Sequence, residues 1–512
     1  MRLVVALSLA AAAAASQPQP PQNPQHNPLL PPHSPNRPTT VTHPAIAAPA
    51  ASLPSAALSG RPALRLEDIL SSVRKSYPPL LAALEERRIA DGDLLVAEGG
   101  FDAVVRAAFE NQQAGPLDNN RLNVVVDQPL AFQGLSFFGG YRLGEGRFSS
   151  SDASSVLTTD LGEYRTGLRL PLFRDRAIDS RRATLWKSRI GLRLADLSVD
   201  QQLIFVIQAA TRRYWDWVAA GQRLRLAETI LNVALTRDQQ LKEAVRLGQL
   251  PQIEVTDNER AILTRRAQVV EARRGLEQAS FELSLFYRDA NGDPVTPLED
   301  LLPPAFPDLA DLSEQRVAED VDLALKRRPE VLRLAAQRDQ TRIDADLARN
   351  QTAPNIDLVF GFNQFAGAGT TPRGNANEVR GSLIFELPFQ RRRALGAVKS
   401  AEARLAQFDQ RERFARDQVI VEVRDAASAV RRAAERTRVL RDEVNIARNL
   451  EELERSRFDL GDSTLFLVNL REQATFDTAV REVSAAADYF RAYALYELAI
   501  AEALSSQPRP TP

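Results

Sequence analysis

Few residues of this chain could do catalytic chemistry. There is no cysteine, and the three histidines, His26, His33 and His43, all lie near the N-terminus. The rest of the chain therefore offers neither imidazole nor thiolate. This excludes Ser-His-Asp catalysis, histidine or cysteine metal sites and histidine proton shuttles there. The sequence predicts that the protein is not an enzyme and that it holds no cofactor and no metal.

The overall charge also limits the possible partners. Charged residues make up 26% of the 512 residues, yet the formal net charge is only −1. A nucleic-acid-binding protein normally carries a basic excess, so this balance argues against nucleic acid as a partner. It is typical of solvated helices whose surfaces mix both signs.

The N-terminus reads as a targeting segment. Met1-Arg2 and the apolar run to Ala15 predict a secretory signal peptide over residues 1–16, although an alanine-rich start without function is the alternative. Residues 17–62 are rich in proline and polar residues and predict a disordered linker, and residues 505–512 predict a disordered tail. No other stretch reaches the roughly 18 apolar residues of a transmembrane helix, so membrane entry would require a β-barrel.

The elements that must position the charged side chains are long helices. From Asp175 to Leu247 the chain has no proline, and apolar residues recur at spacings of three and four. About 70 helical residues make a rod of roughly 100 Å. Gly248 and Pro251 end this helix, and a second, shorter helical run follows from Glu254 to Asp289.

The same pattern returns in the second half of the chain. A long helix is predicted from Ala394 to Leu460, followed by a break at Gly461 and a helical run from Leu465 to Leu504. A strand precedes each long helix, so the chain is a tandem duplication. The predicted order is a first repeat over 63–289 (strands about 99–173, helical hairpin 175–289), a linker over 290–316, and a second repeat over 317–504 (strands about 355–389, helical hairpin 391–504).

The predicted strands alternate in polarity. In Glu163 to Phe173, the apolar positions from Tyr164 to Leu172 alternate with polar residues and glycine. A soluble sheet with one face in water alternates in the same way. The predicted signal peptide, the strands of about ten residues and the long polar loops favour an outer-membrane barrel.

Four landmarks in fixed order give the chain a family resemblance. They are the opening Leu64–Leu70; Arg328-Pro329-Glu330 with its counterpart Tyr77-Pro78-Pro79; the strand ends Leu170-Pro171-Leu172-Phe173 and Leu387-Pro388-Phe389; and the turns Arg246–Leu250 and Arg457–Gly461. By these the chain resembles the TolC-like outer-membrane efflux proteins, over about Leu64 to Leu504.

The resemblance implies a mainly α fold with β: long antiparallel helical hairpins that form a trimeric periplasmic α-barrel, joined to an outer-membrane β-barrel. It implies a homotrimer in the cell outer membrane with a long periplasmic extension. It further implies a passive exit duct of a tripartite efflux or secretion system, opened by an inner-membrane pump and a periplasmic adaptor (membrane fusion) protein. The alternative is a soluble periplasmic coiled-coil scaffold or adaptor protein. The sequence does not name the exported substrate.

The strand count departs from the family. The first repeat has four strand-like runs where the family usually has two, and the additional pair lies near 122–143. This pair could enlarge the barrel, extend its extracellular end or lie outside it.

The second departure concerns the periplasmic tip, where the family places acidic residues after each hairpin glycine. Glu254 and Asp257 occupy these positions after Gly248, three residues apart on one helical face. After Gly461 the matching positions are Leu467 and Leu470. In that half only Asp459 and Asp462 flank the turn.

Two interpretations of these carboxylates stay open. As gate residues, Glu254, Asp257, Asp459 and Asp462 would favour cations and hold the tip shut through pairs between subunits. Alternatively, Glu254 and Asp257 are simply favoured by the dipole at the start of a helix. The apolar run Leu465–Leu467 could form a constriction, an adaptor-facing patch or, most simply, part of the core.

Arginines follow both strand ends, from Arg174 to Arg182 and at Arg391–Arg393. The resemblance implies that these arginines lie at the periplasmic boundary of the membrane, where cations can meet lipid head groups. Solvated helix starts are the alternative.

Overall fold

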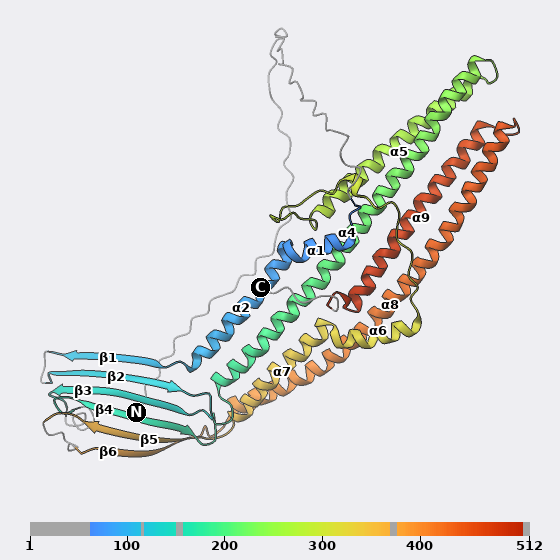
Figure 1. Cartoon of the computed structure of the whole chain (residues 1–512). Coiled ribbons are helices and arrows are strands. Elements are labelled where there is room, and N and C mark those ends of the chain that lie inside the picture. Colours follow the sequence, from blue (N-terminus) through green and yellow to red (C-terminus); the bar gives the residue numbers. More distant parts are fainter. Residues whose placement is uncertain (1–61, 114–116, 150–156, 369–375, 505–512) are drawn as a thin grey trace, which may run out of the picture. The chain divides into compact units, whose positions relative to one another are not determined.

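The computed structural model describes residues 62–113, 117–149, 157–368 and 376–504. The chain divides into two units, Met1–Ala57 and Leu58–Pro512, and all described residues belong to the second (Figure 1). The predicted signal peptide at 1–16, the linker up to residue 61 and the tail at 505–512 lie outside the described residues.

The described unit has the predicted mainly α fold with β, built from two repeats. The first repeat contains α1 (Leu66–Ser76), α2 (Pro78–Glu98), β1 (Val104–Gln112), β2 (Asn119–Pro129), β3 (Ser136–Gly146), β4 (Glu163–Pro171), α4 (Ser180–Arg246) and α5 (Gln252–Ser284). The second contains α6 (Glu314–Arg327), α7 (Pro329–Asn350), β5 (Asn355–Phe365), β6 (Glu378–Glu386), α8 (Arg392–Asp459) and α9 (Leu465–Ala499). Over the described ranges, no helix combines the length and the apolar character needed to cross a membrane.

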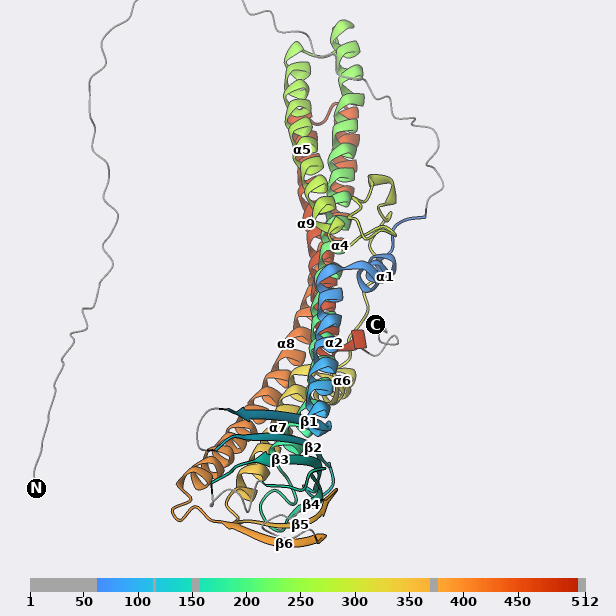
Figure 2. The same ribbon diagram turned by 90° about the vertical axis from the view of Figure 1, so that its left-hand side faces the viewer.

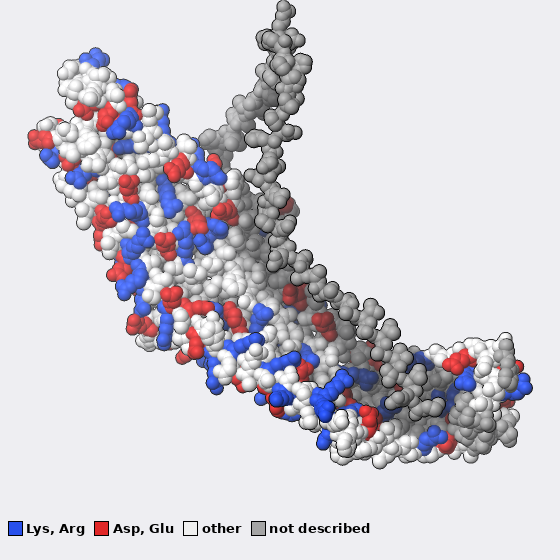
Figure 3. Space-filling model, turned by 180° about the vertical axis from the view of Figure 1, so that it is seen from behind, with Lys and Arg blue, Asp and Glu red and all other residues white. Residues whose placement is uncertain are grey.

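The two longest helices run through both halves of the helical part. Near the hairpin turns, α4 packs on α5 and α9, and α8 packs on α9. Near the sheet, α4 packs instead on α2 and α7, and α8 packs on α7 (Figures 1 and 2). Four helices thus lie side by side at both levels, with α2 and α7 taking the places of α5 and α9. Lys, Arg, Asp and Glu mix along these helices, as the charge balance predicts (Figure 3).

The helix α4 begins at Ser180, later than the predicted start at Asp175, because the turn before it is fixed by a buried arginine. The Asp179 carboxylate accepts a hydrogen bond from the Arg182 amide at 2.9 Å and so caps the helix. The Arg182 guanidinium donates to the three carbonyls of residues 175–177 and to Asp179. Since the Arg182 side chain is only 5% exposed, it neither meets lipid head groups nor is a solvated residue of a helix start, so both interpretations are wrong for Arg182.

All six strands form one antiparallel sheet in the order β1-β2-β3-β4-β5-β6. The additional strand pair of the first repeat forms β2 and β3. They lie between β1 and β4, and each is hydrogen-bonded to its neighbour along its length. Within one chain, the structure therefore excludes the possibility that the additional strand pair lies outside the sheet.

The connector between the repeats packs against both long hairpins. Phe306 stacks on Trp215 of α4 and on Phe490 of α9, with ring centroids 6.0 and 5.7 Å apart, and Trp215 and Phe490 stack at 4.1 Å. Four residues earlier, Leu302 is buried against α4 at Gly221. Trp215 therefore serves packing, and the connector fastens the first repeat to the second.

We expect Gly221→Ala to destabilise the protein, because a Cβ there would lie 2.4 Å from Leu302 Cδ1. Overpacking of this kind costs about 1–3 kcal/mol, which should lower the temperature at which helical circular dichroism is lost. Gly191→Ala is the matched control in α4, since a Cβ at Gly191 meets nothing within 4 Å. It should stabilise the helix by up to about 1 kcal/mol. Equal shifts of the unfolding temperature in the two variants would contradict the packing of Leu302 on Gly221.

Candidate functional site at the helix-hairpin turns

The two hairpins turn in the same way. Gly248 has φ +71° and Gly461 has φ +83°, in the left-handed region that only glycine adopts at no steric cost. At each turn the glycine amide donates at 2.9 Å to the carbonyl three residues earlier. The next amide donates to the carbonyl five residues earlier, at 2.9 Å in the first turn and 2.8 Å in the second. This pair of bonds is a Schellman motif, the conformation in which a glycine commonly ends a helix.

The structure places the four predicted acidic residues in different environments. Glu254 is half-buried in the first turn of α5. The Asp257 carboxylate instead pairs with Arg260 at 3.2 Å and accepts a 3.5 Å hydrogen bond from Asn469 of α9. Asp459 and Asp462 are exposed at the other turn. Within one chain, therefore, Asp257 joins the contact between the hairpins.

The apolar run after the second turn divides into two parts. Leu465 is fully buried against Leu241 and Val255, with Phe458 packed on the same cluster. Its neighbour Phe466 is 62% exposed. Core packing is thus the role of Leu465 within one chain, while Phe466 offers apolar surface at the tip.

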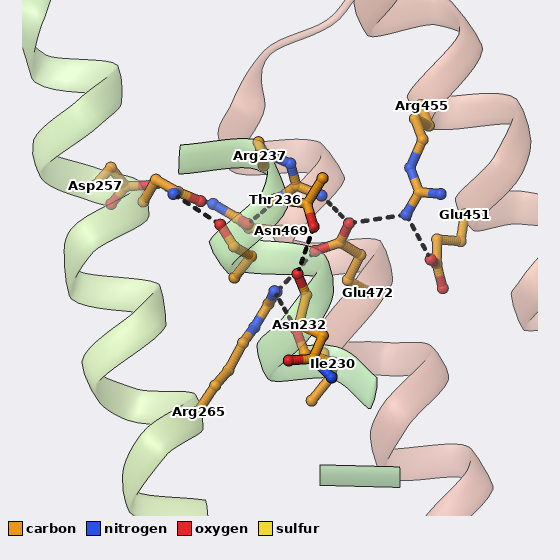
Figure 4. A network of polar contacts seen from close by, with 12 residues as sticks. Ile230, Asn232, Thr236, Arg237, Asp257, Arg265, Glu451, Arg455, Asn469 and Glu472 are labelled. Carbon is orange, nitrogen blue, oxygen red and sulfur yellow. Dashed lines mark hydrogen bonds and ion pairs between the residues drawn. The ribbon is translucent and has the colours of Figure 1, made fainter. Parts of the chain in front are cut away.

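A buried ionic network connects all four hairpin helices below the turns (Figure 4). Its centre is Glu472 of α9, whose side chain is 2% exposed. One carboxylate oxygen accepts from Arg237 of α4 and from Arg455 of α8, the latter at 3.0 Å, and the other accepts from Arg265 of α5 at 2.7 Å. Asn469 extends the network, since it accepts from Arg237 at 2.9 Å and donates to Asp257.

The network keeps Glu472 ionised. Burial raises the pKa of its carboxyl, but the hydrogen bonds and charges of Arg237 and Arg265 outweigh burial and hold the pKa below its ordinary value of 4.5. Arg265, whose side chain is 3% exposed, also donates to the Ile230 carbonyl at 3.1 Å. Removing one member would leave buried charges without a partner, so the four helices depend on each other here.

The sequence holds a signal for this network in the apolar stripes of two helices. Glu472 lies in the stripe of Leu465, Val468 and Ala479, and Arg265 lies in the stripe of Ile262 and Val269, at buried positions of their helices. A charge in an apolar stripe is rarely buried without a partner. The partners themselves are not readable from the sequence, because Arg265 and Glu472 are 207 residues apart.

We predict that Glu472→Gln lowers the stability of the paired hairpins by about 3–5 kcal/mol at pH 7, the cost of breaking a buried ion pair. Because the folded pKa is depressed, the stabilisation by Glu472 is complete above pH 4.5 and is lost as the pH falls through the folded pKa. The stability difference between wild type and Glu472→Gln should therefore shrink below pH 4.5. Thermal unfolding at pH 7 and at acidic pH measures it.

Glu259→Gln is the control for this experiment. Glu259 lies on α5 and pairs with Lys242 at 3.5 Å, but both side chains are 54% exposed. An exposed pair contributes about 0–1 kcal/mol, so this variant should change little. If Glu472→Gln behaves like the control at both pH values, the network does not hold the hairpins together.

The comparisons with known proteins agree with this geometry. Residues 321–499 match the family model of the outer membrane efflux protein. No curated protein sequence matches the chain. The fold is similar to a membrane protein from Pseudomonas aeruginosa (TM-score 0.60, 15% identity, 85% of this chain and 92% of that one). It is also similar to the open state of the MtrE outer membrane channel of Neisseria gonorrhoeae (TM-score 0.59, 15% identity, 85% of this chain and 89% of that one).

A third similar structure is the outer membrane protein VceC of Vibrio cholerae (TM-score 0.57, 14% identity, 85% of this chain and 96% of that one). Each comparison covers both repeats, whereas the family model matches within the second. The second repeat therefore matches the outer membrane efflux protein family, and the described unit has the fold of outer-membrane channels, in agreement with the TolC-like resemblance of the sequence.

Proposed function

We propose that three copies of this chain form the outer-membrane exit duct of a tripartite efflux or secretion system. The duct is a passive conduit, opened by an inner-membrane pump through a periplasmic adaptor. The observation that carries the proposal is the duplicated arrangement of strands, a long helix and a Schellman turn, in a chain whose second repeat matches the outer membrane efflux protein family.

The helices of one chain leave apolar surface at both edges of their layer. The helix α5 packs on α4 and exposes Ile253, Leu263, Val270 and Phe281. At the opposite edge, α8 packs on α9 and α7 and exposes Val421, Val439, Ile446 and Leu453. Packing α5 of one copy on α8 of the next would bury both edges, and such head-to-tail contacts close into a ring. A ring of three is the assembly of the homologous channels.

The two faces of the sheet suit a membrane on one side and water on the other. The register places Val105, Phe109, Leu168, Phe360 and Leu383 on one face, all of them exposed in one chain. The other face carries Arg106, Arg142, Arg165, Asn363 and Arg380. Alternation between a lipid-facing and a lumen-facing side is the pattern of outer-membrane barrels.

The turns are the proposed gate and docking site. Glu254, Asp257, Asp459 and Asp462 place carboxylates around Gly248 and Gly461, which would favour cations at a narrow mouth. Exposed apolar residues at the same turns, Leu247, Leu460 and Phe466, suit contact with the adaptor. Opening would move one hairpin against the other, which strains the Glu472 network.

The proposal is tested by the protein mass of the complex extracted from the membrane fraction with detergent, measured by light scattering with the detergent subtracted. Three chains per complex are expected. A monomer that stays in aqueous buffer without detergent would contradict the duct and favour a soluble periplasmic scaffold or adaptor.

We predict that Glu254→Ala combined with Asp257→Ala raises the resting conductance in a planar bilayer. The double variant removes two carboxylates from the mouth and one hydrogen bond to Asn469, so cation preference should fall as well. Glu277→Ala is the control, because Glu277 is exposed on the same helix far from the turn. Unchanged conductance and selectivity would remove both residues from the gate.

A further inference from the structure

The hairpin of β2 and β3 is built into the sheet from both sides. On one side β1 and β2 pair from Val104 with Asp127 to Gln112 with Asn119. On the other, β3 and β4 pair from Ser136 with Arg169 to Arg142 with Glu163. A hairpin inserted outside the sheet would leave β1 paired with β4. Here β2 and β3 lie between β1 and β4.

Side chains on the polar face join the hairpin to its neighbours. Arg106 of β1 pairs with Asp127 of β2 at 2.5 Å. Arg142 of β3 pairs with Glu163 of β4, and Arg165 of β4 donates at 2.6 Å to Asn123 of β2. These residues belong to a face that borders a hollow of about 570 Å³, which Arg169, Asn363 and Arg380 also line.

The opposite face of the hairpin is apolar. Val124, Val126, Phe137 and Tyr141 share it with Val105 of β1 and Leu168 of β4, according to the register. The hairpin thus repeats the two-faced pattern of the other four strands. Moving it out of the sheet would break the ionic contacts and expose a second apolar surface to water.

The width of the sheet matches the width of the helical layer above it. Four helices at 8–10 Å spacing span roughly 35–40 Å. Six strands about 4.8 Å apart and tilted by about 40° cover roughly 37 Å of circumference, whereas four strands would cover roughly 25 Å. With six strands, one chain therefore contributes similar arcs to both parts.

We propose that the exit of this channel is an eighteen-stranded barrel, six strands from each of three chains, as wide as the helical duct. The inference rests on the proposed function for the ring of three. An eighteen-stranded wall encloses an open aqueous channel rather than a core of side chains. The membrane end adds no second constriction, so bulky hydrated solutes that pass the helix turns leave unhindered. Size selection then lies at the turns.

The test removes the hairpin and measures the width of the exit from outside. Excision of residues 117–146 deletes β2 and β3 and joins two loops at the same end of the sheet. The strands β1 and β4 are antiparallel with matching faces, because Val104, Asp127, Phe138 and Gly167 follow one another across the register. The excised chain can therefore form a four-stranded sheet.

Ser382 provides the probe position. It lies in the middle of β6 on the polar face and lines the hollow, and the chain has no native cysteine. Ser382→Cys is introduced into the full chain and into the excised chain. Maleimides carried on neutral polymers of increasing size are then applied from the outside of intact cells, so the readout does not depend on the closed tip.

The largest polymer that labels the full chain should be about 1.5-fold wider than the largest that labels the excised chain, because barrel diameter grows about linearly with strand number. Equal size limits in two complexes that both contain three chains would overturn the wide exit and leave the duct intact. A full chain that forms no complex of three would overturn the proposed function instead. Failure of a small maleimide to label the Ser382→Cys variant would also overturn the proposed function, since the polar face of the sheet would then line no lumen.

A second measurement uses only the full chain and tests the proposal even if the excised chain does not assemble. In the full chain, Ala107→Cys with Val124→Cys should form a disulfide on oxidation, because these residues are opposite one another in β1 and β2. Ala107→Cys with Tyr164→Cys should not, because β2 and β3 lie between them. The reverse result would show that β1 pairs with β4 in the membrane and would overturn the proposal.

Discussion

The structure depends on apolar surface that one chain cannot cover. The helices α4 and α8, of 67 and 68 residues, bury stripes against the neighbouring helices, and α4 also packs on α1 and on the connector between the repeats, but apolar residues at both edges of the layer stay exposed. The sheet has the same difficulty, because no described helix covers its apolar face. In the proposed duct, a ring of copies and a membrane would bury this surface, and that burial would be the favourable term that stabilises the assembly.

Within one chain, buried polar contacts fix how the layers are joined. Arg182 holds the turn between β4 and α4 through three carbonyls, so strand and helix meet at a defined angle. Glu472 joins the four hairpin helices below their turns. Such contacts contribute little net stability but are costly to break, so they define how the joined elements meet.

The hairpin of β2 and β3 shows how a duplicated fold can change its width without changing its plan. The first residue of β2 and the last residue of β3 lie at the same end of the sheet, and the two faces of the hairpin continue those of β1 and β4. The strands that lead to and from the helices keep their connections, so only the number of strands between them changes. Each repeat still sends one strand into its long helix.

Local patterns determined much of this protein from the sequence alone. Long apolar stripes, the left-handed glycines Gly248 and Gly461 and the alternating strands are set by nearest neighbours along the chain, so helices, turns and strands were readable. The tertiary structure decided what depends on distant residues. It buried Arg182, joined Asp257 to Asn469, placed Glu472 among three arginines and set β2 and β3 inside the sheet. Pairing between strands and ion pairs between helices satisfy groups far apart in the chain, and no local pattern specifies which partner each will find.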